Sequence, residues 1–408
     1  MIKEQLLGAR RRWLFLLALL LWLAACARPQ PQPPVDPPVA APTTDPVDPA
    51  GEPRVRWRYP TTAGLPLALV PDQRGLPYLY VAQQEGGLLV LQETAPDSPP
   101  RAVAHLPVTQ LGELAVMNLT QQGSYLYLAL GNFFARAGAR AGLAVVDVTA
   151  PAQPRLAALW TSATTVGGSS AVLVDGAHVY LAAMEAGLFF FTVAEPAQIT
   201  LRATLLPDIH FPRANPSAVA HPNARGLALQ DHWLYVANDA GGLRVIDVRD
   251  PDAPREVAHA INPHLAGKAQ AYNNLVLAGT LAYVAVDYCG LEIWDLREPT
   301  QPELVGWWNP WGCARGGNLW FNSAGHTNQL AFDPTQQLVY LAAGDSELQV
   351  VQVADPRRPT LVAAHGAPKD RAGAWGLALG EETVYLTYIR AVVPFQGNWR
   401  GIVAFTRL

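Results

Sequence analysis

Residues 233–251 read Trp-Leu-Tyr-Val-Ala-Asn-Asp-Ala-Gly-Gly-Leu-Arg-Val-Ile-Asp-Val-Arg-Asp-Pro. Two runs rich in β-branched and aromatic residues, 233–237 and 243–248, flank a short segment that contains two glycines. This arrangement is typical of an antiparallel β-hairpin. Asp247 and Pro251 then end the second run, because aspartate accepts hydrogen bonds from nearby backbone amides and proline fixes φ. The stretch therefore predicts two strands followed by a structural turn.

The same spacing recurs along the chain with a period of 45–57 residues. The tyrosine of the first run is found seven times, at Tyr80, Tyr127, Tyr180, Tyr235, Tyr283, Tyr340 and Tyr385. The residue that opens the second run is Leu88, Leu143, Leu188, Leu243, Leu291, Leu348 or Ile402. In the first six units a proline lies eight residues after that leucine, at Pro96, Pro151, Pro196, Pro251, Pro299 and Pro356. Repeats of this length with several short strands are typical of β-propeller blades.

Each unit supplies four strands, which in the fourth unit are expected at 226–229, 233–237, 243–248 and 255–259. The seventh unit has segments for only three strands. Upstream of the first unit, Pro53–Trp57 matches the openings of outer strands in other units. We therefore predict an all-β fold, a seven-bladed β-propeller whose last blade is closed by an N-terminal strand. Such closure leaves no free sheet edge.

The third strands of three units share one pattern, found at Leu143–Asp147, Leu243–Asp247 and Leu291–Asp295. Together with the recurring Tyr-Val-Ala, Gly-Leu and Asp-x-x-x-Pro elements, this pattern resembles the LVIVD-repeat family of bacterial surface β-propeller proteins. The resemblance covers residues 53–408, and the third strands of the other units depart from it at positions that include Leu91, Phe191, Val351 and Ala404. It implies a propeller in an extracytoplasmic setting, and it carries over no catalytic residue.

Residues 1–25 are predicted to be a signal peptide, since basic residues precede an apolar run from Trp13 to Leu23 that is short for a membrane span. The following Leu-Ala-Ala-Cys26 resembles a bacterial lipobox, which implies lipidation of Cys26. An ordinary signal peptide and an uncleaved signal anchor are the alternatives. We expect a lipid-anchored, extracytoplasmic protein of the cell envelope, at the outer membrane or the outer face of the cytoplasmic membrane. The lipid anchor is its only expected contact with the membrane.

Residues 26–52 are predicted to form the lipidated cysteine and a proline-rich tether. Ten prolines lie between Pro29 and Pro53, with almost no aromatic or branched apolar side chains. Such a segment cannot bury a core and favours extended, polyproline-like conformers, so it acts as a spacer for the propeller at 53–408. Loss of residues 1–25 changes the formal net charge from −4 to −7, and we expect no nucleic-acid partner.

Differences in loop length fall on one face of the predicted ring. The loops between second and third strands are long at 131–141 and 389–400, and the links between blades are long at 206–225, 262–272 and 309–327. On the opposite face the Asp-x-x-x-Pro turns keep one length. Variation on one rim of a rigid scaffold is typical of a binding face. Neutral tolerance of surface insertions is the alternative.

The segment 307–321 holds four of the ten tryptophans that follow the signal peptide. Aromatic rings beside polar groups can stack on sugars or cover an apolar ligand. The candidates for the binding face are Trp308, Trp311, Arg315, Trp320, His326 and Asn328. Trp308 also occupies the strand position of Trp160 in the second unit, which favours packing into the sheet.

Cys289 and Cys313 map to the same face of the fifth unit, in a compartment where disulfides persist. A disulfide between them would fix the aromatic segment. Two free thiols are the alternative, since the sequence does not show that the Cα atoms come within about 7 Å.

Five loops between second and third strands carry an acid: Glu85, Glu185, Asp239, Asp287 and Asp345. Such a ring of acids can attract a hard cation, but acids are also ordinary in tight turns. The sequence has no Gly-x-Ser-x-Gly elbow, phosphate-binding glycine loop or zinc-like histidine pair. We expect no catalytic residue, metal or cofactor, and an interaction module for an unknown protein or glycan. The alternatives are a metal-assisted hydrolase or lactonase that uses the central funnel, and a structural envelope component.

Overall fold

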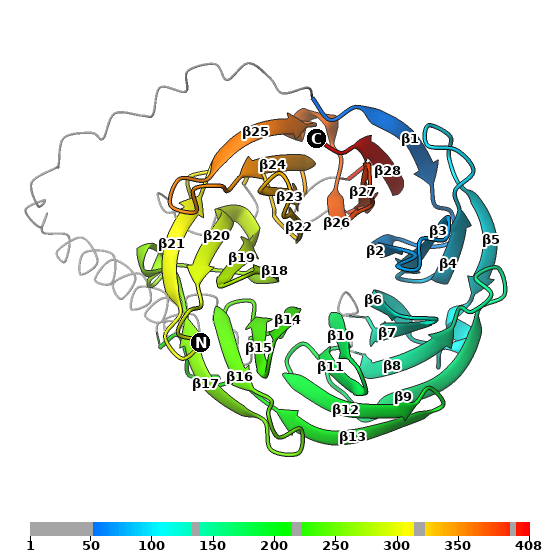
Figure 1. Cartoon of the computed structure of the whole chain (residues 1–408), viewed down its shortest axis with the longest axis horizontal. Coiled ribbons are helices and arrows are strands. Elements are labelled where there is room, and N and C mark those ends of the chain that lie inside the picture. Colours follow the sequence, from blue (N-terminus) through cyan, green and yellow to red (C-terminus); the bar gives the residue numbers. More distant parts are fainter. Residues whose placement is uncertain (1–51, 133–138, 214–221, 314–322, 392–396) are drawn as a thin grey trace, which may run out of the picture. The chain divides into compact units, whose positions relative to one another are not determined.

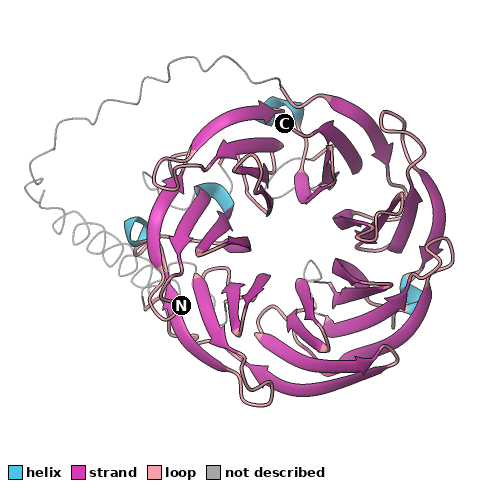
Figure 2. Cartoon of the chain, viewed as in Figure 1, coloured by secondary structure: helices cyan, strands magenta, loops and turns pink. Residues whose placement is uncertain are grey.

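The computed structural model describes residues 52–132, 139–213, 222–313, 323–391 and 397–408. These residues form seven four-stranded antiparallel sheets around a central opening (Figure 1). In each sheet the strand nearest the centre begins the blade, and the following strands lie progressively further out (Figure 1). Strands account for most of the ring, and the helices are short (Figure 2). The prediction of an all-β, seven-bladed β-propeller is confirmed.

Blades one to six each use four consecutive strands, which run in order from the inner to the outer edge of the sheet. Blade one contains β2 (Pro66–Pro71), β3 (Tyr78–Gln83), β4 (Gly87–Gln92) and β5 (Arg101–Leu106). Blade two contains β6 (Ala115–Gln122), β7 (Tyr125–Gly131), β8 (Arg140–Asp147) and β9 (Arg155–Thr165). Blade three contains β10 (Ala171–Asp175), β11 (His178–Ala182), β12 (Leu188–Glu195) and β13 (Gln198–Leu205). Blade four contains β14 (Gly226–Gln230), β15 (Trp233–Ala237), β16 (Leu243–Asp247) and β17 (Arg255–Ala260).

Blade five contains β18 (Tyr272–Ala278), β19 (Leu281–Val286), β20 (Gly290–Asp295) and β21 (Glu303–Trp308). Blade six contains β22 (Gln329–Asp333), β23 (Leu338–Ala342), β24 (Leu348–Gln352) and β25 (Thr360–His365). Blade seven contains β26 (Ala374–Leu379), β27 (Thr383–Tyr388), β28 (Gly401–Thr406) and β1 (Val55–Pro60). The short 3-10 helices are η1 (Val108–Gln110), η2 (Pro263–Leu265), η3 (Asp287–Cys289) and η5 (Pro368–Asp370).

The strand β1 closes the ring, as predicted. It pairs antiparallel with β28 and forms the outer strand of blade seven, so the two ends of the propeller domain share one sheet (Figure 1). Trp57 is opposite Ala404 in this pairing, is 4% exposed and packs on the Tyr385 ring at 5.9 Å between centroids. Pairing and burial therefore both attach the N-terminal strand to the last blade.

The core consists of layers between neighbouring blades. The recurring tyrosines lie on the second strand of each blade and are buried, with their rings in these layers. The hydroxyl groups of three of them bond to polar partners: Tyr80 donates to Asp72 Oδ2 at 2.6 Å, Tyr385 donates to Glu93 Oε1 at 2.7 Å, and Tyr340 accepts from the Leu408 amide at 3.1 Å. The tyrosine repeat thus marks a position where a large ring fills the layer and a hydroxyl group reaches its edge.

A glycine precedes the leucine of the third strand in five blades, at Gly87, Gly142, Gly187, Gly242 and Gly290. All of these except Gly142 have a φ between 78° and 83°, in the left-handed region that favours glycine. A side chain there would also collide with a backbone carbonyl of the outer strand, such as that of Leu106 in blade one. The backbone conformation and the lack of space at this position therefore require a glycine before the leucine.

The Asp-x-x-x-Pro turns have the local chemistry predicted for them. The Oδ1 atoms of Asp147, Asp247 and Asp295 each accept from the backbone amide two residues later, at 2.8–3.0 Å. The expectation of one turn length holds for blades two to six, where the residues paired across the turn are eight apart, as in Asp147 with Arg155 and Thr192 with Thr200. Blade one is longer by one residue, since Gln92 pairs with Arg101.

Within the described ranges, no helix combines the length and the apolar character needed to cross a membrane.

Candidate binding face

The loops of variable length lie on one face of the ring, because both loop types leave the blade at the same end. In blade four, Gly226, Ala237, Leu243 and Ala260 are aligned across the four strands at that end. The second-to-third loop and the links to neighbouring blades all start there. We call this the loop-bearing face. Its links 206–225 and 309–328 each span twenty residues, whereas connections on the opposite face span eight at most.

At the centre of this face, residues at the starts of the seven inner strands surround a narrow constriction. Its lining residues are Leu67, Met117, Asn118, Ser170, Arg225, Asn273, Asn328, Gln329 and Trp375. The cavity between them measures about 20 Å³, enough for about one water molecule. Side chains therefore almost close the channel at this level.

The constriction has a polar side and an apolar side. On the polar side Ser170 Oγ donates to the Ala224 carbonyl at 2.7 Å, and Asn273 Nδ2 donates to the Thr327 carbonyl at 2.9 Å. On the apolar side Leu67, Met117 and Ile389 form a buried cluster with the partly buried Trp375. The polar groups bond to the backbone of the next blade, so they fix the spacing of the inner strands.

Three of the predicted acids, Asp239, Asp287 and Asp345, lie in the second-to-third loops of blades four to six. We call the rim of the channel on the loop-bearing face, where these loops lie, the mouth. Asp287 contacts His326 Nδ1 at 2.6 Å. Burial raises the pKa of Asp345 to about 6, although the nearby His326 opposes the shift. Burial also raises the pKa of Asp239, against the effects of Arg225 and of a hydrogen bond from Asn223.

The remaining two acids, Glu85 and Glu185, are exposed. Among the side chains that the structure describes, no group of three or more His, Cys, Asp or Glu is placed to hold a metal ion. Asp287 and Asp239 instead bond to neighbouring protein groups, His326 and Asn223.

The second-to-third loops also connect adjacent blades. Isolated bridges join Met184 to Ala224, Asp239 to Tyr272 and Gly344 to Ala374. Each bridge links the loop of one blade to the residue at the start of the next inner strand. The mouth is therefore held by backbone pairing between blades as well as by side chains.

Arg244 anchors the link that enters blade four. Its guanidinium group has no exposed surface and donates to the carbonyls of Asp208 at 3.1 Å and Phe211 at 2.9 Å. It also pairs with Glu256 at 2.8 Å and lies 5.2 Å from the centre of the Phe211 ring. One buried cation thus attaches residues 208–211 to the sheet through several bonds.

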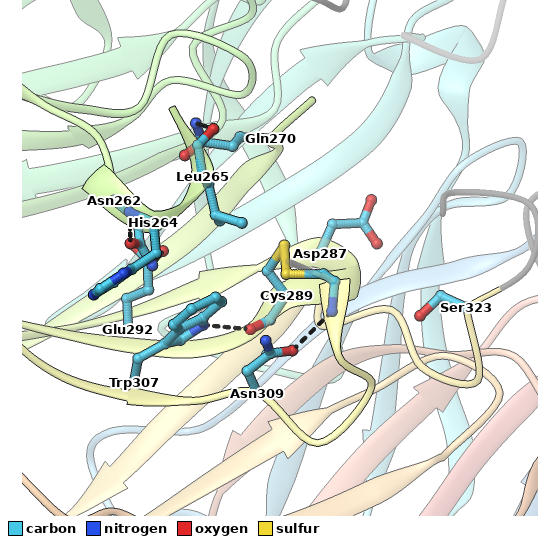
Figure 3. The surroundings of a disulfide bond; sticks show 12 residues. Asn262, His264, Leu265, Gln270, Asp287, Cys289, Glu292, Trp307, Asn309 and Ser323 are labelled. Atoms are coloured by element: carbon cyan, nitrogen blue, oxygen red, sulfur yellow. Dashed lines mark hydrogen bonds between the residues drawn. A yellow bond between two sulfur atoms is a disulfide. The ribbon is translucent and has the colours of Figure 1, made fainter. Parts of the chain in front are cut away.

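Glu292 occupies the equivalent position in blade five and anchors the link that enters that blade. Its carboxylate has no exposed surface and accepts from Asn262 Nδ2 at 2.8 Å and Trp294 Nε1 at 3.0 Å. Tyr272 is a third hydrogen-bond partner. Figure 3 shows Glu292 beside Asn262 at the base of the link.

Gln349 has this position in blade six and donates to the Ser346 carbonyl at 2.6 Å. The Ser346 hydroxyl in turn donates to the Ala324 carbonyl in the entering link, at 2.6 Å. The residue that follows the recurring leucine of the third strand therefore contributes to link attachment in three consecutive blades. This role is not among the sequence predictions, although Arg244 and Glu292 are charged residues at a position that is otherwise mostly apolar.

Cys289 and Cys313 are joined by a disulfide with a Cα–Cα distance of 5.3 Å (Figure 3). Both cysteines are buried. Trp307 Nε1 donates to the Cys289 carbonyl at 2.8 Å, and the Cys313 amide donates to Asn309 Oδ1 at 3.2 Å. The disulfide and these bonds attach the start of the long link to η3, next to the mouth.

The six predicted binding-face residues do not form one exposed patch. Trp308 is 8% exposed in β21 and packs edge-on against the partly exposed Trp311 at 5.7 Å between ring centroids. His326 and Asn328 are buried near the constriction. Arg315 and Trp320 lie outside the described residues. The buried side chains of Trp308, His326 and Asn328 offer little surface to a ligand. Their contribution to the loop-bearing face is therefore structural.

The LVIVD repeat family model matches residues 115–161, 222–259 and 266–309. These segments coincide with blades two, four and five, whose third strands carry the repeating pattern. The chain therefore contains LVIVD repeats. No curated protein matches it.

Several solved β-propellers are similar in fold. The Cps50 (Swd1) β-propeller domain of Myceliophteria thermophila has a TM-score of 0.59 at 12% identity, over 87% of this chain and 100% of that one. The RRP9 WD40 repeats give 0.61 at 12% identity, over 88% and 98%. Sqt1 of Saccharomyces cerevisiae gives 0.55 at 9% identity, over 84% of both chains. At these identities the likeness shows the fold alone.

Proposed function

We propose that this chain, a seven-bladed propeller with LVIVD repeats, is a lipid-anchored extracytoplasmic protein that binds a protein or glycan at the cell envelope. The contrast between the two faces of the ring carries the proposal. One face has short connections, whereas the other has the twenty-residue links and the bonds that attach them. Variable loops on a rigid scaffold are the usual arrangement of a binding surface.

The anchoring half of the proposal rests on the sequence before the propeller. A basic segment, an apolar run and Leu-Ala-Ala-Cys26 precede the proline-rich residues 27–52. Lipid attached to Cys26 would hold the protein at the membrane, with the proline-rich segment as a spacer. We further propose membership of the LVIVD-repeat family of bacterial surface propellers, whose extracytoplasmic setting agrees with such an anchor.

Replacing Cys26 by serine is expected to move the protein from the membrane fraction to the soluble fraction, because the lipid acceptor is lost. Cell fractionation with immunoblotting measures this change, and metabolic labelling with a fatty acid shows whether the lipid is present. A double variant, Cys289→Ser with Cys313→Ser, keeps Cys26 and should remain with the membrane. A wild-type protein that takes up no fatty-acid label, or a Cys26→Ser protein that still takes it up, would disprove the lipid anchor.

The binding half of the proposal predicts that partners contact the loop-bearing face and not its opposite. It is tested by comparing the cross-links that form from each face in intact cells. Among the described residues, no observation specifically favours the metal-assisted hydrolase or lactonase. We therefore propose a single function.

A further inference from the structure

Blade seven carries a positive charge that the rest of the ring does not. Residues 53–60 and 366–408, which form this blade and the link into it, hold eight basic and three acidic side chains, a formal charge of +5. Residues 61–365 hold sixteen basic and twenty-five acidic side chains, a formal charge of −9. A ring that is acidic as a whole therefore has one basic blade.

The basic side chains at the opposite face of blade seven are neutralised by acids. Each of these three arginines forms an ion pair: Arg54 with Asp97 and Arg56 with Glu382, both at 3.4 Å, and Arg407 with Asp333 at 2.7 Å. These pairs leave little net charge for a partner on that side of the blade.

The other five basic side chains lie at the loop-bearing end of the blade. We call them the basic patch: Arg58, Lys369, Arg371, Arg390 and Arg400. None of the five forms an ion pair with a side chain that the structure describes, and all except Arg400 are exposed. Asp370 is the acid between two of them, while nearby Glu347 is buried and accepts from the Tyr388 hydroxyl at 2.8 Å. The charge of the patch is therefore available to a partner.

Hydrogen bonds bring the patch together from separate segments. The Asn398 amide donates to the Arg371 carbonyl at 2.9 Å, which joins the second-to-third loop of blade seven to the link that enters the blade. Arg400 Nε donates to the Thr61 carbonyl at 3.1 Å, which joins the end of the same loop to the end of β1. The patch is therefore one surface, built from β1, the link and the two ends of the loop.

The predicted tether ends beside this patch. Burial lowers the pKa of the partly buried His365, Arg58 lowers it further, and Asp370 and Glu52 raise it. Glu52 is the last residue of the tether, and its charge therefore acts at the same place as the charge of Arg58. The chain that leads to Cys26 thus leaves the propeller at its basic blade.

We propose that the basic patch docks on the anionic headgroups of the membrane that holds the lipid anchor. Lipid phosphates match unpaired arginine and lysine side chains, and each such side chain adds to the attraction. The tether favours this partner, because residues 27–52 span at most about 80 Å as an extended polyproline helix and keep the patch near the bilayer. The role at the membrane rests on the proposed anchor, whereas the affinity for anionic lipid does not.

Docking through blade seven would orient the ring. Blade seven lies across the ring from blades three and four (Figure 1). The long link 206–225 joins those two blades, so its attachment points would lie on the side away from the membrane. The patch would therefore turn this part of the loop-bearing face toward partners outside the bilayer.

Vesicle binding by residues 27–408 tests the docking surface without the lipid. This chain lacks the signal peptide and Cys26 but keeps all seven sheets, whose strands lie within residues 55–406. We expect it to sediment with vesicles of equal parts phosphatidylcholine and phosphatidylglycerol, and not with phosphatidylcholine alone. Salt at about 0.5 M should release it, because salt shortens the range of charge attraction. Equal binding to both kinds of vesicle, or binding to neither, would overturn the proposal.

A triple variant connects the affinity to the patch. Arg58→Gln with Lys369→Gln and Arg390→Gln removes three exposed charges and should weaken binding to the anionic vesicles by roughly tenfold to 10²-fold. Arg400 stays in place because it bonds to the backbone beside β1. Undiminished binding by this variant would overturn the docking surface.

The matched control removes the same charge elsewhere. It combines Arg101→Gln, Arg155→Gln and Arg255→Gln, at the exposed starts of β5, β9 and β17 on the opposite face. The control should bind like the parent chain, and a loss equal to that of the patch variant would contradict the proposal. Binding to soluble dextran sulfate without binding to vesicles would assign the patch to a polyanionic polymer and also overturn it. Because residues 27–408 carry no lipid, each of these results leaves the proposed anchor standing.

Discussion

Deleting residues 53–59 is expected to lower the melting temperature by roughly 10 °C or more. The deletion removes almost all of β1, and with it the pairing to β28 and the burial of Trp57. Loss of a buried tryptophan alone typically costs about 3–5 kcal/mol. The deletion also leaves β28 as an open sheet edge, which favours aggregation. Thermal unfolding followed by circular dichroism measures the effect.

Two comparisons separate ring closure from a general effect of shortening the chain. A deletion of equal length at residues 30–36, within the proline-rich segment, should leave the melting temperature unchanged. Trp57→Ala should show part of the loss, because it removes the ring packed on Tyr385 but keeps the strand. If the 53–59 deletion melts like the wild-type protein, β1 does not close the propeller.

Replacing Arg244 by methionine is expected to lower the free energy of unfolding by about 3 kcal/mol or more. Methionine fills similar space but donates no hydrogen bonds, so the carbonyls of Asp208 and Phe211 lose their donor. Glu256 also loses its ion-pair partner. Arg244→Lys should recover only part of the loss, because one ammonium group cannot reach the same set of acceptors as a planar guanidinium group.

Denaturant unfolding measures the change in stability, and limited trypsin digestion at Arg213 reports on the attached link. Faster cleavage there would follow from release of residues 208–211. Arg249→Met is the matched control in the same blade, since its side chain is 65% exposed in the pair with Asp247 and should contribute at most about 1 kcal/mol. Equal effects of the Arg244 and Arg249 variants would contradict the anchoring role.

The architecture can be predicted from the sequence because each blade needs the same residue types at the same positions. A tyrosine fills the layer between blades, a glycine such as Gly242 adopts a positive φ, and an aspartate such as Asp247 binds the turn amides. These requirements are local in sequence and recur at fixed spacing. The closing strand at Pro53–Trp57 could be predicted because its sequence resembles the starts of the other outer strands.

The details of the loop-bearing face are harder to predict from the sequence, because they depend on contacts between segments far apart in the chain. The sequence suggests Trp308 as a ligand contact, but its neighbours in blades five and six bury it. Arg244 reaches a link that lies more than thirty residues earlier in the chain, so its partners have no local signature. A charged residue at an apolar position of a repeat is the one signal that indicates such an anchor.

Position-specific cross-linking in intact cells tests most directly whether the loop-bearing face is the binding surface. A diazirine residue, which reacts with both protein and glycan, is placed at Glu85 or Glu185 on that face, and at Asp252 or Arg297 on the opposite face. All four side chains are exposed. We expect high-mass adducts from Glu85 or Glu185 and none from Asp252 or Arg297. Adducts that form only from the opposite face, or equally from both, would contradict the proposed binding surface.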